Sequence, residues 1–122
     1  MDGFLIFAGL LTLLTTGVHI VMGGRDVVTP LLEAQLEDEA RYTLYVLWHF
    51  ISVFFVFTAA LFLLVGFGVT DAPDAVTALS SLYLLFGLVF LSVKLFVFKS
   101  FGLSHLPQWI LLIPIGMLGL LS

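Results

Sequence analysis

The sequence predicts an all-α fold, an integral membrane four-helix antiparallel bundle with both termini on the non-cytoplasmic side. Hydrophobic residues make up 61% of the chain, against roughly 45–50% in soluble domains. Charged residues make up only 10%, against about 25% in soluble domains. The apolar residues fall into four runs separated by short polar segments. A chain of 122 residues is expected to form a single membrane domain over residues 1–122.

The first two runs are long enough to cross a bilayer. Residues 4–22 are apolar, which matches the ~20 residues needed to cross about 30 Å of hydrocarbon. The pair Gly23-Gly24, followed by Arg25 and Asp26, predicts the end of this helix. The second apolar run covers residues 42–68. We therefore predict one crossing in each run.

The last two runs are separated from the second by a short turn. Asp74 is placed to cap a third helix over residues 75–98. The fourth helix is predicted over residues 107–121, where Pro107 suits a first-turn position. Pro114 interrupts this short segment, so we expect a tilted or kinked crossing, with a half-membrane segment as the alternative.

The polar residues 23–41 are predicted to form a loop on the cytoplasmic side. Thr29 followed by Pro30 resembles a helix start, and Leu31, Leu32 and Leu36 give a weak apolar stripe. We predict a surface helix over residues 30–37. The alternative is a second membrane helix that starts at Pro30 and runs on without a break.

Basic residues give the orientation of the chain. All four lie at or near the end of the bundle that holds the first and third connections, which we name the loop side: Arg25, Arg41, Lys94 and Lys99. The opposite side carries only acidic residues: Asp2, Asp71 and Asp74. Short loops rich in Lys and Arg face the cytoplasm. We therefore predict a multi-pass protein of the cell membrane, of the bacterial inner-membrane type, with the loop side in the cytoplasm.

Composition excludes several classes of function. The net charge of −4 argues against nucleic acid as a partner, because binding to phosphates needs clustered Lys and Arg. The absence of cysteine excludes disulfides, thiolate metal sites and cysteine nucleophiles. No residue set matches a catalytic motif, so the sequence leaves open whether the protein is an enzyme. The lipid bilayer is one expected partner, and a second copy or a larger membrane complex is another.

The predicted topology brings the three histidines to the loop side. His19 lies near the end of the first helix, His49 near the start of the second, and His105 before the fourth. Imidazole is a common ligand of Zn, Cu, Fe and Ni, and a carboxylate can complete such a set. The first hypothesis is therefore a metal or haem site formed by His19, His49, His105 and Asp26. A supporting polar face is predicted on three helices, at Thr16, Tyr45, Ser52 and Tyr83.

Two other hypotheses use the same end of the molecule. In one, Arg25 and Lys94 supply positive charge for an anion, a proton or a lipid head group in an oligomeric small transporter. In the other, the protein is a non-catalytic accessory subunit of a membrane complex. The histidines then only form interhelical hydrogen bonds, and Lys94 extends to the interface.

Overall fold

The computed structural model describes residues 1–100 and 102–122, and this part of the chain is helical without any β-strand. The all-α prediction is confirmed. Along the chain the elements are α1 (Gly3–Gly23), η1 (Gly24–Val28), α2 (Thr29–Glu33), α3 (Asp38–Gly66), α4 (Pro73–Val93), η2 (Lys94–Phe98) and α5 (Trp109–Leu121). The elements η1 and η2 are π-helical turns.

Three of the continuous helices are long and apolar enough to cross a membrane. They cover Gly3–Glu33, Asp38–Gly66 and Pro73–Phe98, with 31, 29 and 26 residues. At 1.5 Å per residue, these helices measure roughly 46, 43 and 39 Å, against about 30 Å for the hydrocarbon core. The apolar helix α5 has 13 residues and measures about 20 Å. The membrane character predicted from composition therefore has a structural counterpart in three long helices and one short one.

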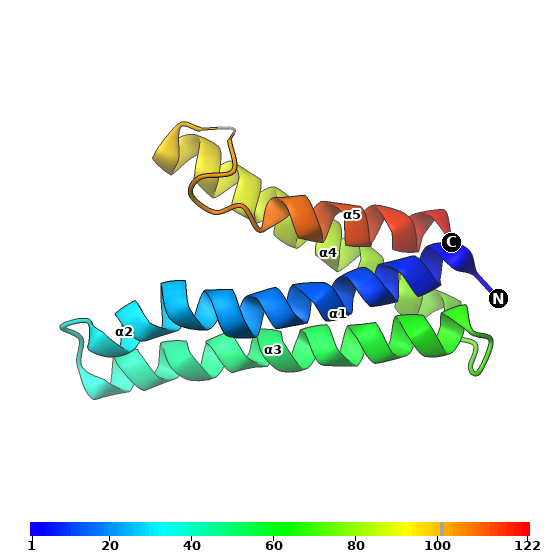
Figure 1. Ribbon diagram of the computed structural model, residues 1–122, viewed down its shortest axis with the longest axis horizontal. Coiled ribbons are helices and arrows are strands. Elements are labelled where there is room, and N and C mark those ends of the chain that lie inside the picture. Colours follow the sequence, from blue (N-terminus) through cyan, green and yellow to red (C-terminus); the bar gives the residue numbers. More distant parts are fainter. Residues whose placement is uncertain (101) are drawn as a thin grey trace.

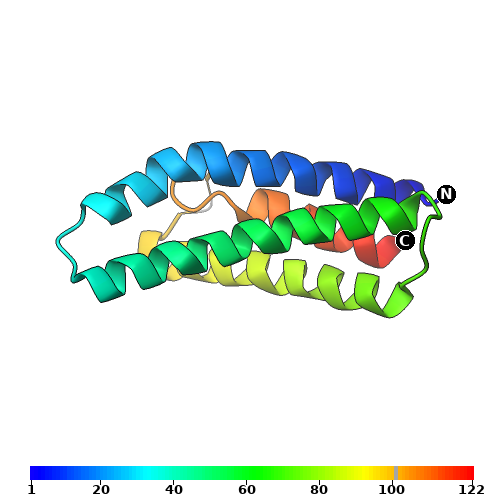
Figure 2. The same cartoon turned by 90° about the horizontal axis from the view of Figure 1, so that it is seen from below.

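The helices pair into two hairpins (Figure 1). Helix α1 packs along α3, α4 packs along α5, and α1 also contacts α5. Both termini lie at the same end of the bundle (Figures 1 and 2). Toward the opposite end, the loop side, α4 and η2 diverge from α1, so the two hairpins separate there (Figure 1).

The first helix does not end at Gly23, contrary to the prediction. Gly24 keeps a right-handed helical backbone, and its N–H donates to the carbonyls of Ile20 and Val21. The N–H of Thr29 then donates to the Gly24 carbonyl across a π-turn. Pro30 lies at the start of α2, where proline is tolerated because it has no N–H to leave unpaired. Residues 34–37 are the connection, so neither the loop over 23–41 nor a separate surface helix over 30–37 is formed.

The other boundaries differ by a few residues. Helix α3 begins at Asp38, between the two predicted alternatives of Pro30 and residue 42. Asp74 lies in the first turn of α4 and not at its cap, where its charge still favours the positive end of the helix dipole. Helix α5 begins at Trp109 and contains Pro114 within it.

Arg41 holds the short connection between α2 and α3 in place. Its guanidinium donates to the Ala34 carbonyl at 2.8 Å and to the Leu36 carbonyl at 2.9 Å. It also pairs with Asp38 at 2.6 Å. The carbonyls at a helix end lack intrahelical partners, and here the arginine supplies them.

Small residues allow the paired helices to approach closely. A Cβ at Gly66 would lie 3.0 Å from the Ile6 nitrogen, and a Cβ at Gly116 would lie 2.6 Å from the Ser80 carbonyl oxygen. Helices in lipid associate through such close packing, because no hydrophobic effect drives them together. Glycine is therefore required at the α1–α3 and α4–α5 contacts.

Aromatic side chains fill the centre of the bundle. Tyr83 is completely buried, and its ring stacks on Phe54 and Phe55 with centroids 5.3 and 5.9 Å apart. Its hydroxyl lies beside those of Thr12 and Thr58 without the geometry of a hydrogen bond. Both threonine hydroxyls instead donate to carbonyls one turn back in their own helices.

Candidate functional site

His19 projects from α1 onto α3 near the loop side. Its Nε2 lies 2.9 Å from the Ser52 hydroxyl and 3.3 Å from the Trp48 carbonyl oxygen. The imidazole stacks on the Trp48 indole with ring centroids 4.0 Å apart, and it makes an edge-to-face contact with Phe55 at a centroid distance of 5.3 Å. The side chain is half-buried. These contacts fix both the position and the plane of the ring.

Gly23 makes this arrangement possible. A Cβ at this position would lie 2.6 Å from the indole ring of Trp48. The indole therefore occupies the space that a larger residue would fill, and it lies against both Gly23 and the His19 ring. Trp48 and Phe55 were not among the predicted site residues, although the position of Gly23 one turn after His19 is a signal that a large side chain packs there.

His49 reaches the same hydroxyl from α3. Its Nδ1 lies 3.4 Å from Ser52 Oγ, and its ring meets the edge of Tyr45 with centroids 4.7 Å apart. The separation of His49 and Ser52 by three residues places them on neighbouring positions of one helix face. His49 is exposed, whereas Ser52 is buried. One buried hydroxyl thus links a half-buried imidazole to an exposed one.

The acceptors around His19 determine the direction of these hydrogen bonds. The Trp48 carbonyl can only accept, so the bond to it requires a proton on His19 Nε2. The same N–H then faces the Ser52 oxygen, and the Ser52 hydroxyl has two acceptors within reach, the Trp48 carbonyl at 3.5 Å and His49 Nδ1 at 3.4 Å. With the hydroxyl turned toward His49, the contacts run from His19 through Ser52 to His49, and a neutral His49 then carries its proton on Nε2.

Lys94 is the first residue of η2, and its side chain is completely buried. Its ammonium donates to the Ser104 carbonyl at 2.7 Å and also to the His105 carbonyl. The ammonium does not extend away from the protein, because it donates to backbone carbonyls that precede α5. The sequence predicted a positive charge at this depth but could not show its partners.

His105 lies on the other hairpin from His19 and His49. It is exposed, its φ of 44° is in the left-handed region, and its ring stacks on Phe98 with centroids 4.5 Å apart. Its contacts therefore differ from those of the other two histidines. The structure pairs His19 with His49 and leaves His105 apart.

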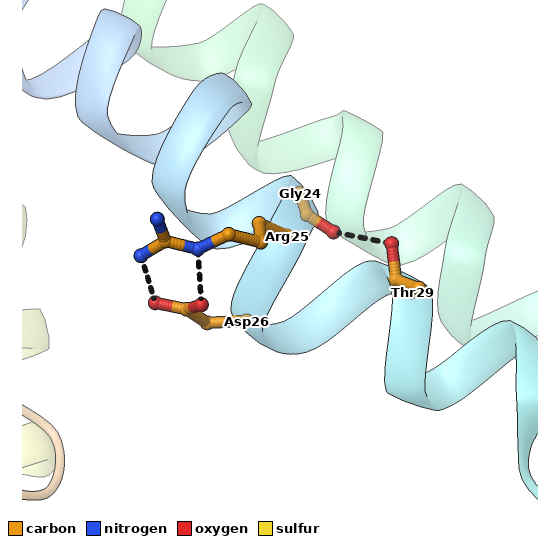
Figure 3. A network of polar contacts seen from close by, with 4 residues as sticks. All are labelled: Gly24, Arg25, Asp26 and Thr29. Carbon is orange, nitrogen blue, oxygen red and sulfur yellow. Dashed lines mark hydrogen bonds and ion pairs between the residues drawn. The ribbon is translucent and has the colours of Figure 1, made fainter.

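Arg25 and Asp26 lie in η1 and bind each other (Figure 3). Their two hydrogen bonds measure 2.7 and 3.1 Å, and both side chains are exposed. Next to them, the Thr29 hydroxyl donates to the Gly24 carbonyl at 3.1 Å. Asp26 thus neutralises Arg25, and neither side chain takes part in the contacts of His19.

The predicted supporting residues have different positions. Thr16 is buried and donates to the Thr12 carbonyl at 2.8 Å within α1, and Tyr83 lies in the centre of the bundle. Tyr45 and Ser52 contact the histidines as described above. Within residues 1–100 and 102–122, no three histidine or acidic side chains are grouped closely enough to hold a metal ion. Among these described residues, the predicted metal ligands His19, His49, His105 and Asp26 are therefore not grouped as a metal site.

Comparison with protein-family models, with curated proteins and with solved structures found no match to the chain.

Proposed function

We propose that this chain is a four-crossing membrane protein that exchanges protons at its loop side through the chain His19–Ser52–His49. In this proposal the loop side faces the cytoplasm, α5 completes the fourth crossing, and both termini lie on the other side. The contact of Ser52 with both imidazoles carries the proposal, because chains of this kind relay protons in pumps and transporters.

A proton can pass along this chain by shifting two hydrogen bonds. When His19 is an imidazolium, its Nε2 proton moves to the Ser52 oxygen while the Ser52 hydroxyl proton moves to His49 Nδ1. His19 is then neutral with its proton on Nδ1, and His49 is the imidazolium. Ser52 regains its hydroxyl in the same step, so the proton count balances. His49 is the exposed end of the chain, and in this proposal it releases the proton on the loop side.

The geometry favours this reading over a metal or haem site. A haem held by both histidines would need their imidazoles to face each other across a gap, whereas His19 and His49 approach the same hydroxyl. The packed core also limits what one copy can do, since Tyr83, Phe62 and Ile115 fill the centre completely. Passage of protons across the membrane would therefore use a surface shared between copies, and we propose an oligomer as the active form.

The test is proton flux into vesicles that contain the purified protein and a trapped pH-sensitive dye. We expect Ser52→Ala and His49→Ala to lower the flux roughly tenfold or more, in line with the loss of a positioned proton carrier. Ser52→Thr should keep it, because threonine retains the hydroxyl. His105→Ala is the matched control, since this histidine is exposed on the other hairpin. Equal flux from the parent, Ser52→Ala and His49→Ala would overturn the proposal.

A second readout examines the relay without transport. Nitrogen NMR of histidine-labelled protein should show the Nε2–H tautomer for both His19 and His49 when they are neutral. Ser52→Ala should alter the Nδ1 signal of His49, because that atom loses its donor. An unaltered His49 spectrum in this variant would show that the hydroxyl is not bonded to it.

A further inference from the structure

The hairpin of α4 and α5 carries a positive charge that nothing within the chain balances. From Ala75 to Ser122 the sequence contains Lys94 and Lys99 but no aspartate or glutamate. Among the described residues the ion pairs are Arg25–Asp26 and Arg41–Asp38, and neither involves Lys94. The acidic residues of the loop side all belong to the first hairpin, which diverges from η2 at that end (Figure 1).

A buried ammonium of this kind is costly. Lys94 is completely buried, and its partners are two neutral carbonyls, those of Ser104 and His105. An ionisable side chain within a membrane segment is rare and usually marks a ligand or ion site. A charge removed from water is strongly destabilised unless an opposite charge is close. Lys94 has hydrogen bonds but no counter-charge.

Lys94 follows a helix that is about as long as the hydrocarbon core of a bilayer is thick. The 21 residues of α4 measure about 31 Å, so Lys94 lies at the edge of the ~30 Å hydrocarbon core. Helix α5 is shorter, so residues 102–108 return toward the bundle at this level. Backbone carbonyls need donors in a membrane. The Lys94 ammonium donates to those of Ser104 and His105, whereas those of Pro107 and Gln108 accept from N–H groups in the first turn of α5.

The cover over Lys94 is thin and strained. Ser104 and His105, whose carbonyls accept from the ammonium, are both exposed. His105 and Leu106 have φ values of 44° and 51°, in the left-handed region that residues with a Cβ adopt only at an energetic cost. Outward movement of these residues would relieve that strain and uncover the ammonium.

We propose that Lys94, Ser104 and His105 form a binding site for a phosphate-type oxyanion at the loop-side surface. The oxyanion replaces the Ser104 and His105 carbonyls on the ammonium and supplies the missing counter-charge. Arg25 is not part of this site, because Asp26 already neutralises it on the other hairpin. The oxyanion is either the phosphate of an anionic phospholipid or free inorganic phosphate.

The experiment uses the full chain purified in detergent. Phosphatidylglycerol binding is measured by native mass spectrometry, with phosphatidylcholine as the zwitterionic comparison, and inorganic phosphate binding is measured by calorimetry. We expect Lys94→Gln to weaken binding roughly tenfold or more, as for the loss of a charged hydrogen bond. Glutamine still has an N–H for the carbonyls, so thermal unfolding should show that this variant remains folded. Lys94→Arg should retain binding, and Arg25→Gln is the control for general loss of charge.

The two binding measurements distinguish a lipid phosphate from free inorganic phosphate as the ligand. Binding of phosphatidylglycerol alone supports a lipid phosphate, and competition by inorganic phosphate supports a site for the free oxyanion as well. Absence of binding by both probes, or equal binding to the parent and a folded Lys94→Gln, would overturn the proposal.

Discussion

At the scale of single residues, the two hairpins use different means to accommodate polar side chains. The first hairpin joins His19 and His49 through the Ser52 hydroxyl, which is a side-chain partner for one nitrogen of each ring. The second hairpin uses one long side chain, Lys94, to satisfy the backbone that precedes α5. Tyr83 follows neither pattern, because its buried hydroxyl has no partner with hydrogen-bond geometry.

We therefore predict that the ring of Tyr83 stabilises the bundle and that its hydroxyl contributes little. Tyr83→Phe should change the free energy of unfolding by less than about 1 kcal/mol, because no well-formed hydrogen bond is lost. Tyr83→Ala should cost about 3–5 kcal/mol through the cavity it leaves. Unfolding of both variants in detergent can be followed by circular dichroism. A cost of more than ~2 kcal/mol for Tyr83→Phe would mean that the hydroxyl is bonded to Thr12 or Thr58.

The sequence predicted part of this residue-level picture. Two histidines on consecutive helices, each on a polar face, led to the prediction that His19 and His49 lie near each other, and in the structure both contact Ser52. The polar face also identified Ser52, which joins them. His105 was misplaced with them, because topology gives the end of the bundle at which a residue lies but not the hairpin whose side chains it contacts. The carbonyl partners of Lys94 depend on the backbone of residues 102–108, which no side-chain pattern encodes.

At the scale of helices, the contact between α4 and α5 depends on the absence of a side chain at Gly116. A Cβ there would lie 2.6 Å from the Ser80 carbonyl oxygen and 2.9 Å from the Leu84 nitrogen. Both are backbone atoms, so a change of rotamer cannot relieve the clash. The two helices would have to move apart.

We predict that Gly116→Ala lowers the free energy of unfolding by about 1–3 kcal/mol, as overpacking does in other cores. Gly17→Ala is the matched control, because nothing lies within 4 Å of a Cβ at Gly17. The control should be neutral or stabilising by up to ~1 kcal/mol, since alanine favours the helix. Thermal unfolding in detergent compares the two. Equal stability of both variants would contradict the close contact seen at Gly116.

Helix existence was predictable, whereas helix ends were less so. The apolar runs predicted each long helix, because a helix needs ~20 consecutive apolar residues to cross a bilayer. The pair Gly23-Gly24 was misread as a terminus, since glycine ends a helix only where the backbone adopts a left-handed conformation, and Gly24 has a φ of −58°. The start of α3 at Asp38 depends on the Arg41 contacts across the turn, which link residues that have no periodic relation.

At the scale of the whole molecule, the first hairpin is longer than a membrane is thick. Its helices of 31 and 29 residues exceed a ~30 Å core by roughly 13–16 Å. We expect the excess to lie at the loop side, where most charged residues of this hairpin are found: Arg25, Asp26, Glu33, Glu37, Asp38, Glu39 and Arg41. We expect this part of the hairpin to project into water.

The topology can be tested with single cysteines, because the chain has none of its own. We place them at Asp2, Glu37, Asp71 and Ser122 and label intact cells with an impermeant reagent. The distribution of Lys and Arg predicts labelling at every position except Glu37, which should react only after the membrane is opened. The reverse labelling pattern would show that the loop side faces away from the cytoplasm. Labelling of Asp2 without Ser122 would mean that α5 does not cross.

The wide turn in η1 has a consequence for which side of the helix meets α3. One additional residue turns everything after it by about 100°. In an unbroken α-helix, the face that carries His19 and Gly23 would continue near Asp26. The Asp26 carboxylate would then point toward α3. The additional residue instead places Val28 and Leu31, both partly buried, on that side, and Arg25 and Asp26 remain exposed.

Removal of one residue from this turn should therefore convert it to regular α-helix without changing the side that α3 contacts. We predict that deletion of the exposed Val27 leaves the protein folded, with unfolding energy within about 1 kcal/mol of the parent. Deletion of Leu13, in the middle of α1, should unfold the hairpin, because it turns either Thr12 or Thr16 out of the core. Circular dichroism and thermal unfolding compare the two deletions. If the Val27 deletion lowers the stability more than the Leu13 deletion does, the additional residue has a role of its own. The π-turn would then do more than set which side of the helix faces α3.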